Sequence, residues 1–346
     1  MSKLEGASRT TPDKAPHGAP ARLCYRSVPI AGGETAQETE MVEKVEKIWM
    51  DGELVPWDQA QVHVLTHTLH YGLGAFEGIR CYETDDGRSA IFRLREHIRR
   101  LFDSARIVTI DIPFSEAQLV EACIETVRAS GLKSCYLRPL VWLGSGAMGL
   151  GAMTNRTHVA VIAWKWGAYL GDEGLNHGIR ARVSSFTRPG INMQMAKGKI
   201  VGHYVNSILA KREAIATGFD EAILLDAQGY VSEASGENIF VVRDGVVATP
   251  PLGSSILGGI TRDTTLALLR EMNVEVRERL ISRDELYIAD EIFMVGTAAE
   301  VTPVREVDGR TVGIGTRGPL SARVQERYFQ VVRGIEPPEA SWLTYA

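Results

Sequence analysis

The distribution of hydrophobic and polar residues predicts strands and helices that are gathered in separate clusters. Segments in which apolar and polar residues alternate predict strands, and apolar residues three or four positions apart predict helices. The expected strands cover residues 47–55, 61–66, 78–83, 134–143, 157–166, 178–186, 221–226, 229–233, 238–243, 274–279 and 291–295. The expected helices cover residues 94–108, 115–130, 200–217, 261–272 and 319–333. This order favours an α+β or mixed fold over a regular βαβ repeat.

Short local signals support these predictions. Asp-Gly pairs at residues 51–52, 244–245 and 308–309 are typical of two-residue hairpin turns. Ser115 followed by Gln118 has the spacing of a capping box at a helix start. Residues 68–78 are too rich in glycine for a regular element, so we expect a loop there.

The pattern also predicts the domain organisation. Residues 1–44 contain many Pro, Gly, Ser, Thr and Glu residues, which indicates a flexible N-terminal extension. We expect a smaller domain over residues 45–165 and a larger domain over 178–346. The glycine-rich residues 166–177 would link the two.

Composition limits the classes of protein and partner. The 346-residue chain is 45% hydrophobic and 23% charged, which is ordinary for a globular protein with room for two cores. Its formal net charge of −5 argues against nucleic acid or an anionic membrane as the main partner. No apolar run approaches the roughly 18 residues of a membrane helix, and no secretory signal is evident, so we expect a cytoplasmic protein. The four cysteines and eight histidines show no metal-ligand spacing.

Two lysines near the middle of the chain are candidates for covalent chemistry. Lys197 and Lys199 lie among Met, Ala, Gly, Ile and Val just before a predicted amphipathic helix. A lysine attacks a carbonyl only as the neutral amine, so burial or nearby positive charge would have to lower its pKa. Taken alone, both side chains are as readily explained as solvated lysines.

Two glycine-rich segments are candidates for binding phosphate. Residues 144–149 match the dinucleotide fingerprint, but a strand follows them directly, so the helix that this motif requires is missing. Residues 254–263 lead straight into a helix, where glycines, helix-terminal amides and the Thr261 hydroxyl suit an anion. An ordinary helix entry with Thr261 as the N-cap is the alternative.

A third segment, Ser232-Glu-Ala-Ser-Gly-Glu-Asn238, carries two carboxylates at a strand end. It could be a solvated turn, or a buried carboxylate there could pair with a protonated pyridine nitrogen. An amine for an aldehyde, an anion site and a carboxylate for a ring nitrogen together match the needs of pyridoxal 5′-phosphate (PLP).

At this level the sequence resembles the class IV aminotransferases, and specifically the branched-chain amino acid aminotransferases. The resemblance extends from about residue 48 to the C-terminal helix. It rests on motifs in the family's order at residues 68–72, 76–80, 136–139, 166–169, 202–207, 232–238, 259–262 and 296–299. It implies a two-domain fold type IV enzyme with a smaller α/β sandwich domain. The larger domain would combine a barrel-like mixed sheet with helices.

The resemblance implies roles for individual residues. Lys199 would be the catalytic Schiff-base lysine, because the family's tyrosine follows it by five residues and Tyr204 stands there. Glu233 would hold the pyridine nitrogen, Tyr204 the phenolic oxygen, and Leu257 would pack on the ring. The phosphate would lie on Arg100, Ile260, Thr261 and Thr297. The substrate would contact Tyr71, Phe76, Gly78, Arg80, Tyr136, Arg138, Met148 (from a partner subunit), Trp166, Tyr169, Thr297, Ala298 and Ala299.

The implied activity is the transfer of an amino group from leucine, isoleucine or valine to 2-oxoglutarate, in a homo-oligomer that is a dimer or a dimer-based hexamer. Arg138 would help to bind the dicarboxylate. The alternatives with the same fold are a D-amino acid transaminase, an amine transaminase and an aminodeoxychorismate lyase. A nicotinamide dehydrogenase and a cofactor-free binding protein are the alternatives from other classes.

Overall fold

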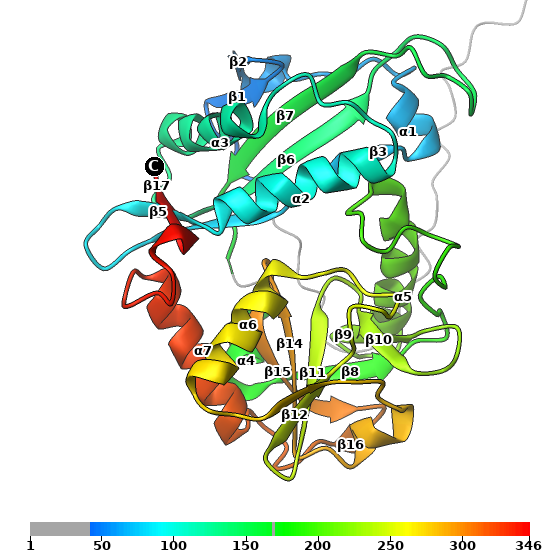
Figure 1. Cartoon of the computed structure of the whole chain (residues 1–346), viewed down its shortest axis with the longest axis vertical. Helices are drawn as coiled ribbons and strands as arrows, with labels where there is room; N and C mark the ends of the chain where they lie inside the picture. Colours follow the sequence, from blue (N-terminus) through cyan, green and yellow to red (C-terminus); the bar gives the residue numbers. More distant parts are fainter. Residues whose placement is uncertain (1–41, 168–169) are drawn as a thin grey trace, which may run out of the picture. The chain divides into compact units, whose positions relative to one another are not determined.

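The computed structural model describes residues 42–167 and 170–346, which belong to one compact unit and contain two β-sheets (Figure 1). The first sheet is antiparallel throughout, in the order β17-β5-β4-β6-β7-β1-β2, with β3 paired to β6. Its strands are β1 (Lys47–Met50), β2 (Glu53–Pro56), β3 (Gly74–Phe76), β4 (Ile79–Glu83), β5 (Ser89–Phe92), β6 (Cys135–Leu143), β7 (Thr157–Trp164) and β17 (Leu343–Tyr345).

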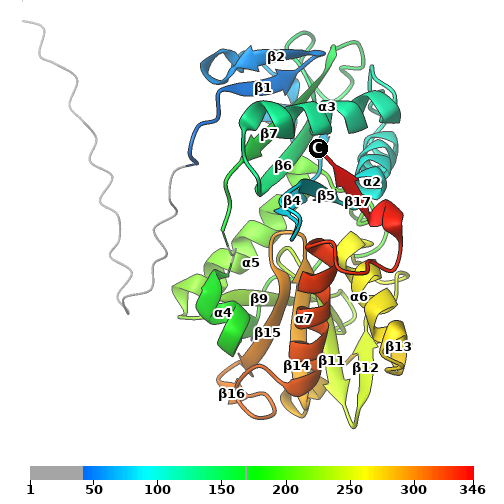
Figure 2. The same ribbon diagram turned by 90° about the vertical axis from the view of Figure 1, so that its left-hand side faces the viewer.

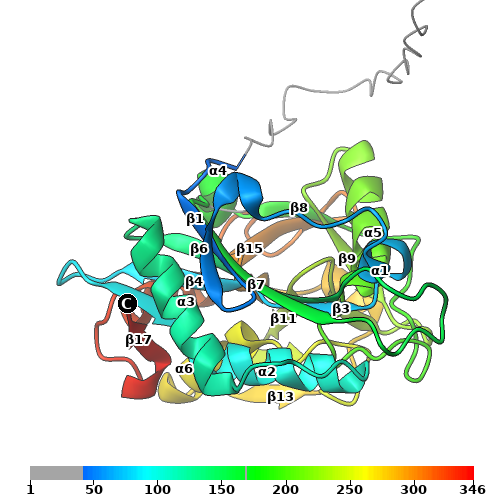
Figure 3. The same cartoon turned by 90° about the horizontal axis from the view of Figure 1, so that it is seen from above.

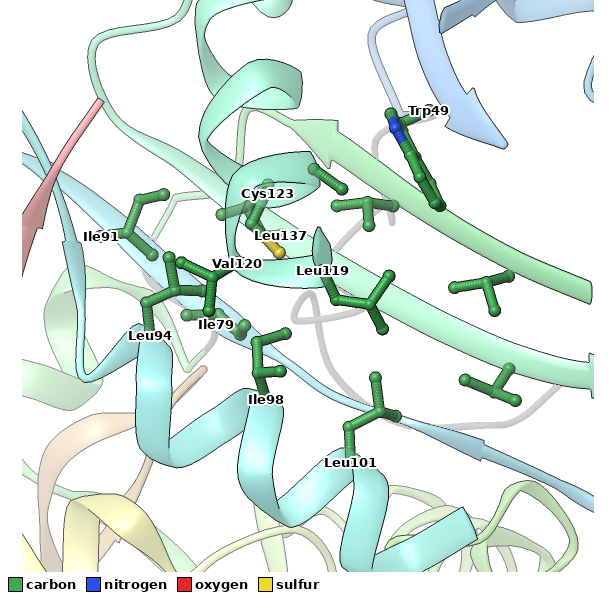
Figure 4. Close-up of a cluster of buried hydrophobic side chains, with 14 of the residues drawn as sticks. Trp49, Ile79, Ile91, Leu94, Ile98, Leu101, Leu119, Val120, Cys123 and Leu137 are labelled. Atoms are coloured by element: carbon green, nitrogen blue, oxygen red, sulfur yellow. The ribbon is translucent and has the colours of Figure 1, made fainter. Parts of the chain in front are cut away.

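Two helices, α2 (Leu94–Ile107) and α3 (Glu116–Ser130), pack on one face of the first sheet and enclose a core (Figure 4). Ile98, Leu119 and Leu137 are fully buried in it, one each from α2, α3 and β6. Ser115 caps α3 in the predicted capping box with Gln118. The packing fixes α2, which carries Arg100 toward the second sheet.

The second sheet is mixed, in the order β10-β9-β8-β15-β14-β11-β12-β13, with β16 paired to β15. Its strands are β8 (Ile179–Val183), β9 (Glu221–Leu225), β10 (Val231–Ala234), β11 (Asn238–Arg243), β12 (Val246–Thr249), β13 (Val276–Glu278), β14 (Glu291–Gly296), β15 (Glu300–Val307) and β16 (Arg310–Thr311). The parallel pairs are β8–β9, β8–β15 and β12–β13, and the other pairs are antiparallel.

Helices flank this second sheet, namely α4 (Gly171–His177), α5 (Tyr204–Ala216), α6 (Ile260–Glu271) and α7 (Pro319–Val332). α6 and α7 lie beside β11 and β14 (Figure 2). These elements share a core in which Phe240 stacks on Phe293. α5 packs against β9 and, seen from above, lies on the opposite side of the molecule from β17 (Figure 3).

The predicted α+β class is confirmed, and so are the three hairpin turns. Both residues of each Asp-Gly pair have positive φ, for example 51° at Asp51 and 108° at Gly52, as these tight turns require. The glycine-rich loop at residues 144–156 joins β6 to β7 without a helix, as expected.

The strand predicted at residues 61–66 is wrong. These residues form a turn that leads into a short helix, α1 (His67–Tyr71), and the alternating Val62 and Val64 are 55% and 68% exposed. The alternation therefore marks an apolar surface and not a half-buried strand. The loop expected at residues 68–78 holds most of α1 and all of β3. A Cβ on Gly74 would lie 2.9 Å from the Val141 carbonyl oxygen, so glycine permits this close pairing.

The last strand, β17, was not predicted, and it pairs with β5 in the first sheet. The chain thus returns from the second sheet to the first one at its C-terminus. α4 occupies the second half of the predicted link, whereas the predicted domain boundaries remain predictions. Within the described residues, no helix has the length and apolar character needed to cross a membrane, and no cluster of His, Cys, Asp or Glu is placed to hold a metal ion.

Candidate active site

A cavity lies where α2, the segment before α5, the β10–β11 turn, the start of α6 and the end of β14 meet. It is lined by all the residues predicted to hold the cofactor: Arg100, Lys199, Tyr204, Glu233, Leu257, Ile260, Thr261 and Thr297. These residues are far apart in the sequence, and the fold brings them to one place.

Lys199 stands at one end of this set, half-buried, with its Nζ donating to the Tyr204 hydroxyl at 2.8 Å. Its backbone is held on both sides, because its N–H donates to Ser104 Oγ at 2.9 Å and its carbonyl accepts from the Phe76 N–H at 3.1 Å. Burial alone would lower the pKa of Lys199, but electrostatic interaction with Tyr204 and with the Glu77 carboxylate outweighs it and raises the pKa. The expected lowered pKa is therefore wrong for these surroundings, and a proton must leave Lys199 before it can act as a nucleophile.

Lys197 is exposed, as expected for a solvated lysine, but its ammonium group also has protein partners. Its Nζ donates to three carbonyl oxygens of one loop, those of Leu252, Ser254 (3.4 Å) and Ile256 (2.9 Å). This loop leads directly to Leu257 and to the start of α6. Lys197 therefore clamps the loop that carries one wall of the cavity.

The start of α6 is built to receive an anion. Its N-cap is Gly259 and not Thr261, and no side chain caps the helix. The first-turn amides of Ile260 and Thr261, which have no partner inside the helix, are therefore left to a ligand. A Cβ on Gly259 would lie 2.0 Å from Asn238 Oδ1, so only glycine allows this approach.

Arg100 reaches the same end of the cavity and is held by a buried acid. Its Nε and Nη2 donate to the two oxygens of Glu77 at 2.7 and 2.9 Å, and its Nη1 donates to the Gly258 carbonyl at 2.9 Å. His97 Nδ1 also contacts Glu77, at 2.7 Å. Burial alone would raise the pKa of Glu77, but the charges of Arg100 and His97 outweigh it and hold the pKa below its usual range. Glu77 is thus a fixed carboxylate that orients Arg100.

Glu233 is a buried carboxylate in the wall of the cavity. Arg188 Nη2 donates to its Oε1, while Asn238 Nδ2 (3.2 Å) and the Leu257 N–H (3.1 Å) donate to its Oε2. Burial raises the pKa of Glu233, and the Arg188 charge opposes that rise. The other acid of this segment, Glu237, is also buried, and burial together with the Glu221 charge raises its pKa to about 8.

An aromatic cluster adjoins Lys199. The Phe76 ring lies 5.1 Å from Lys199 Nζ and 4.9 Å from the Tyr204 ring. Arg138 lies over Phe76 at 4.7 Å, and its buried Nε has no hydrogen-bond partner among the described residues. Tyr136 packs on both Trp164 and Trp166, at 5.1 and 4.4 Å. The cluster thus combines an apolar wall with one cation that has hydrogen-bonding capacity left.

Gly78 and Arg80 shape this region in different ways. A Cβ on Gly78 would lie 1.8 Å from the Tyr136 hydroxyl, so glycine leaves the space for that group. Arg80 donates to the carbonyls of Thr297 and Ala298 on one side and of Trp166 and Gly167 on the other. All of these contacts are with backbone, so Arg80 ties the 297–299 turn to the segment after β7.

Among the predicted substrate residues that the structure describes, only Thr297 lines this cavity. The adjoining region contains Phe76, Gly78, Arg80, Tyr136, Arg138, Trp166, Ala298 and Ala299. Tyr71 on α1 is 43% exposed, and Met148 in the β6–β7 loop is 41% exposed. Within the described part of the chain, neither lines the cavity. Tyr169 lies outside the described residues.

The sequence prediction missed three residues of the site. Glu77 and Asn238 belong to motifs that were recognised, but nothing in the sequence separates a buried, hydrogen-bonded acid or amide from a solvated one. Arg188 follows β8 in an Arg-Pro pair that gives no functional signal. Buried charge and hydrogen bonding, which only the fold defines, identify all three.

The arrangement fits a phosphorylated aldehyde with a basic ring nitrogen. The uncapped helix start and Arg100 suit its phosphate, Lys199 its aldehyde carbon, and the buried Glu233 a protonated ring nitrogen. The lysine and the anion site lie on one cavity, as a single ligand requires.

Comparison with known proteins agrees with this geometry. Residues 74–307 match the family described as Amino-transferase class IV. A Pseudomonas aeruginosa protein named branched-chain-amino-acid aminotransferase is 52% identical over 304 residues, which cover 88% of this chain and 98% of that protein.

Solved structures agree as well. The crystal structure of the Escherichia coli branched-chain amino acid aminotransferase has a TM-score of 0.85 at 47% identity, over 87% of this chain and 99% of that one. The branched-chain amino acid aminotransferase from Thermobaculum terrenum, solved in its PLP-form (holo-form), has a TM-score of 0.82 at 32% identity, over 87% of this chain and 98% of that one.

The chain belongs to the class IV aminotransferases. The predictions of this family, of its fold and of an aminotransferase are thereby confirmed.

Proposed function

We propose that this chain transfers the amino group of leucine, isoleucine and valine to 2-oxoglutarate, with pyridoxal 5′-phosphate as its cofactor. The observation that carries the proposal is one cavity that joins the Lys199–Tyr204 pair, the buried Glu233 and the uncapped start of α6. Its relatives in P. aeruginosa and E. coli are named for branched-chain amino acids, and the T. terrenum structure is the holo-form with PLP.

When bound, the cofactor carries the amino group and takes up the electron pair released at the substrate Cα. Lys199 holds the aldehyde carbon and later moves the proton at the substrate Cα, and Tyr204 is the hydrogen-bond partner of its amine. Glu233 holds the ring nitrogen. Arg100, Thr297 and the amides of Ile260 and Thr261 hold the phosphate, while Leu257 packs on the ring.

The aromatic cluster is proposed as the substrate side-chain pocket. Phe76, Tyr136 and Trp166 offer an apolar wall for a branched side chain. Arg138 stacks on this wall, and its Nε has no partner among the described residues, so it can bind the distal carboxylate of 2-oxoglutarate in the same pocket. The 297–299 turn would take the α-carboxylate, and Arg80 would position that turn rather than touch the substrate.

The pocket is proposed to be completed by a second subunit. α5 buries Ser207, Ala210 and Ala214 against the sheet, yet Val205, Ile208 and Leu209 on its other side are 59%, 47% and 42% exposed. A helix that is apolar on two faces is typical of burial on both. Met148 and Tyr71 would then reach the substrate from the partner. Dimer and hexamer both fit this interface, and a cytoplasmic location remains a prediction.

The test is a panel of amino donors with 2-oxoglutarate as the acceptor. The isolated protein should be yellow, and L-leucine or L-valine should convert its spectrum to that of pyridoxamine phosphate. Lys199→Ala should be colourless and inactive, while Lys197→Ala should be yellow when pyridoxal phosphate is present in excess. Turnover of D-alanine or a simple amine without activity on L-leucine would instead favour the transaminases of other specificity.

A further inference from the structure

The carboxylate of Glu233 has a partner that the assigned chemistry does not use. Arg188 follows β8, and its backbone N–H donates to the Leu225 carbonyl at 2.8 Å. Its Nη2 donates to Glu233 Oε1, and its Nη1 donates to Ser207 Oγ of α5 at 3.3 Å. The side chains of both ions are largely shielded from solvent. Arg188 and Glu233 therefore form a buried ion pair, and contacts with β9 and α5 fix the position of Arg188.

The two oxygens of Glu233 have different surroundings. Oε1 receives the guanidinium, whereas Oε2 receives two neutral donors, Asn238 Nδ2 and the Leu257 N–H. Lys199 and Lys197 also contribute positive charge near Glu233, and Glu237 contributes a neighbouring acid. Of these groups, Arg188 is the one that touches the carboxylate with a full positive charge.

A buried carboxylate beside a basic ring nitrogen can share one proton in two ways. The proton can lie on the nitrogen, which leaves an ion pair, or on the carboxylate, which leaves two neutral groups. A low-dielectric cavity favours the neutral arrangement. A guanidinium stays charged at every pH at which the protein is folded, and it stabilises the ionised carboxylate that it touches.

We propose that Arg188 is a positioning residue that keeps Glu233 ionised and oriented, and thereby keeps the proton on the ring nitrogen of the cofactor. This inference rests on the proposed function, because it requires pyridoxal phosphate in the cavity. Arg188 is proposed to act through Glu233, which it contacts directly.

The test places ¹⁵N at the ring nitrogen of pyridoxal phosphate and measures its NMR shift in the reconstituted holoenzyme. The wild type should show a protonated nitrogen. Arg188→Gln, which retains hydrogen bonding without charge, should move the shift toward the unprotonated value, as should Glu233→Gln. Arg188→Lys, which retains the charge, should stay near the wild type. Arg182→Gln is the matched control, because Arg182 donates to Thr217 outside the cavity.

The rates of transamination should fall in the variants in which the ring nitrogen loses its proton. With L-leucine, kcat should fall at least about tenfold in Arg188→Gln, because charge developing in the reaction loses its stabilisation, and Arg188→Lys should recover most of it. A protonated nitrogen in Arg188→Gln would overturn the proposal, and so would an unprotonated one in Arg188→Lys.

A further variant covers the case in which Arg188→Gln does not fold. Ser207→Ala removes the hydroxyl that holds Arg188 but keeps the guanidinium charge. It must therefore leave the ring nitrogen protonated, and an unprotonated nitrogen would refute the role of the charge. A wild type that fails to bind the cofactor would instead refute the proposed function.

Discussion

Individual side chains fix the segments that form the wall of this cavity, and Lys197 is one example. Three carbonyl oxygens of one short loop converge on its ammonium group, two residues before Lys199. The loop carries Leu257 and enters α6, so Lys197 ties the proposed anion-binding wall to the segment that carries Lys199. A clamp of this kind sets the distance between the two ends of a ligand.

We therefore expect Lys197→Met to release pyridoxal phosphate more readily. Hydrogen bonds from a charged donor contribute about 1.5–3 kcal/mol, so the dissociation constant should rise by about tenfold or more. Equilibrium dialysis of the holoenzyme measures it. Lys133→Met is the control, because Lys133 also donates to a carbonyl, that of Gly87, but outside the cavity. Equal affinity in both variants would refute the clamp.

Glu77 is expected to act through Arg100. Removal of one partner of a buried ion pair leaves the other charge unpaired, at a cost of about 3–5 kcal/mol. Glu77→Gln should therefore weaken pyridoxal phosphate binding strongly, and binding of pyridoxal, which has no phosphate, much less. Titration with the two compounds separates these effects. Glu96→Gln, one helical turn before Arg100 and paired with Arg93 instead, should change neither affinity.

Glu237 should make stability depend on pH. Burial and the Glu221 charge raise its pKa to about 8, above its ordinary value of 4.5. Between these values the folded chain binds more protons than the unfolded one, so this carboxyl lowers stability as pH rises. Glu237→Gln should gain in Tm relative to wild type from pH 5 to pH 8. The exposed Glu125→Gln should show no such trend, and a flat difference for Glu237→Gln would contradict the assignment.

At the scale of elements, the start of α6 is the part most sensitive to small changes. Gly259 leaves no room for a Cβ beside Asn238, which in turn holds Glu233 and the Leu257 carbonyl. The helix start and Glu233, the carboxylate proposed to hold the ring nitrogen, are therefore coupled through one amide side chain.

Gly259→Ala should displace Asn238 and abolish retention of the cofactor, measured as loss of visible absorbance after gel filtration. Gly258→Ala is the matched control, because it makes the same substitution one residue earlier without crowding Asn238. Its Cβ would meet nothing closer than a Leu252 methyl at 3.8 Å, an ordinary contact. If Gly258→Ala lost the cofactor as completely, crowding at Asn238 would not be the cause.

Elements with local signals were predicted well from the sequence. The Asp-Gly turns and the Ser115 capping box depend on neighbouring residues alone, and they appear as expected. β17 was missed because it is short and its partner, β5, lies in the first third of the chain. The residues of the site also differ in whether local sequence or long-range contact reveals them. Lys199 and Glu233 stand out in recognisable segments, whereas Arg188 and Glu77 gain significance only from burial.

At the scale of the whole molecule, the outer face of α5 is the proposed subunit interface. Ile208 lies one turn from Val205 and next to Leu209, and all three are exposed. Ile208→Asp should place a charge in the proposed subunit interface and yield a smaller species by light scattering. Activity should fall with it if Met148 completes the pocket. Ile288→Asp, at an exposed residue outside α5, should leave both unchanged. An unaltered mass for Ile208→Asp would exclude α5 from the interface.

Strand β17 has a consequence for the order of folding. β17 ends one residue before the last residue of the chain, yet it forms the outer strand of a sheet whose other members are made first. Trp342, just before it, is buried in a core with α6 and α7, and Arg93 lies over its ring. A chain in which β17 has not yet paired exposes the edge of β5, and such edges invite pairing with other chains. The pairing of β17 is thus the folding step that protects this edge from aggregation.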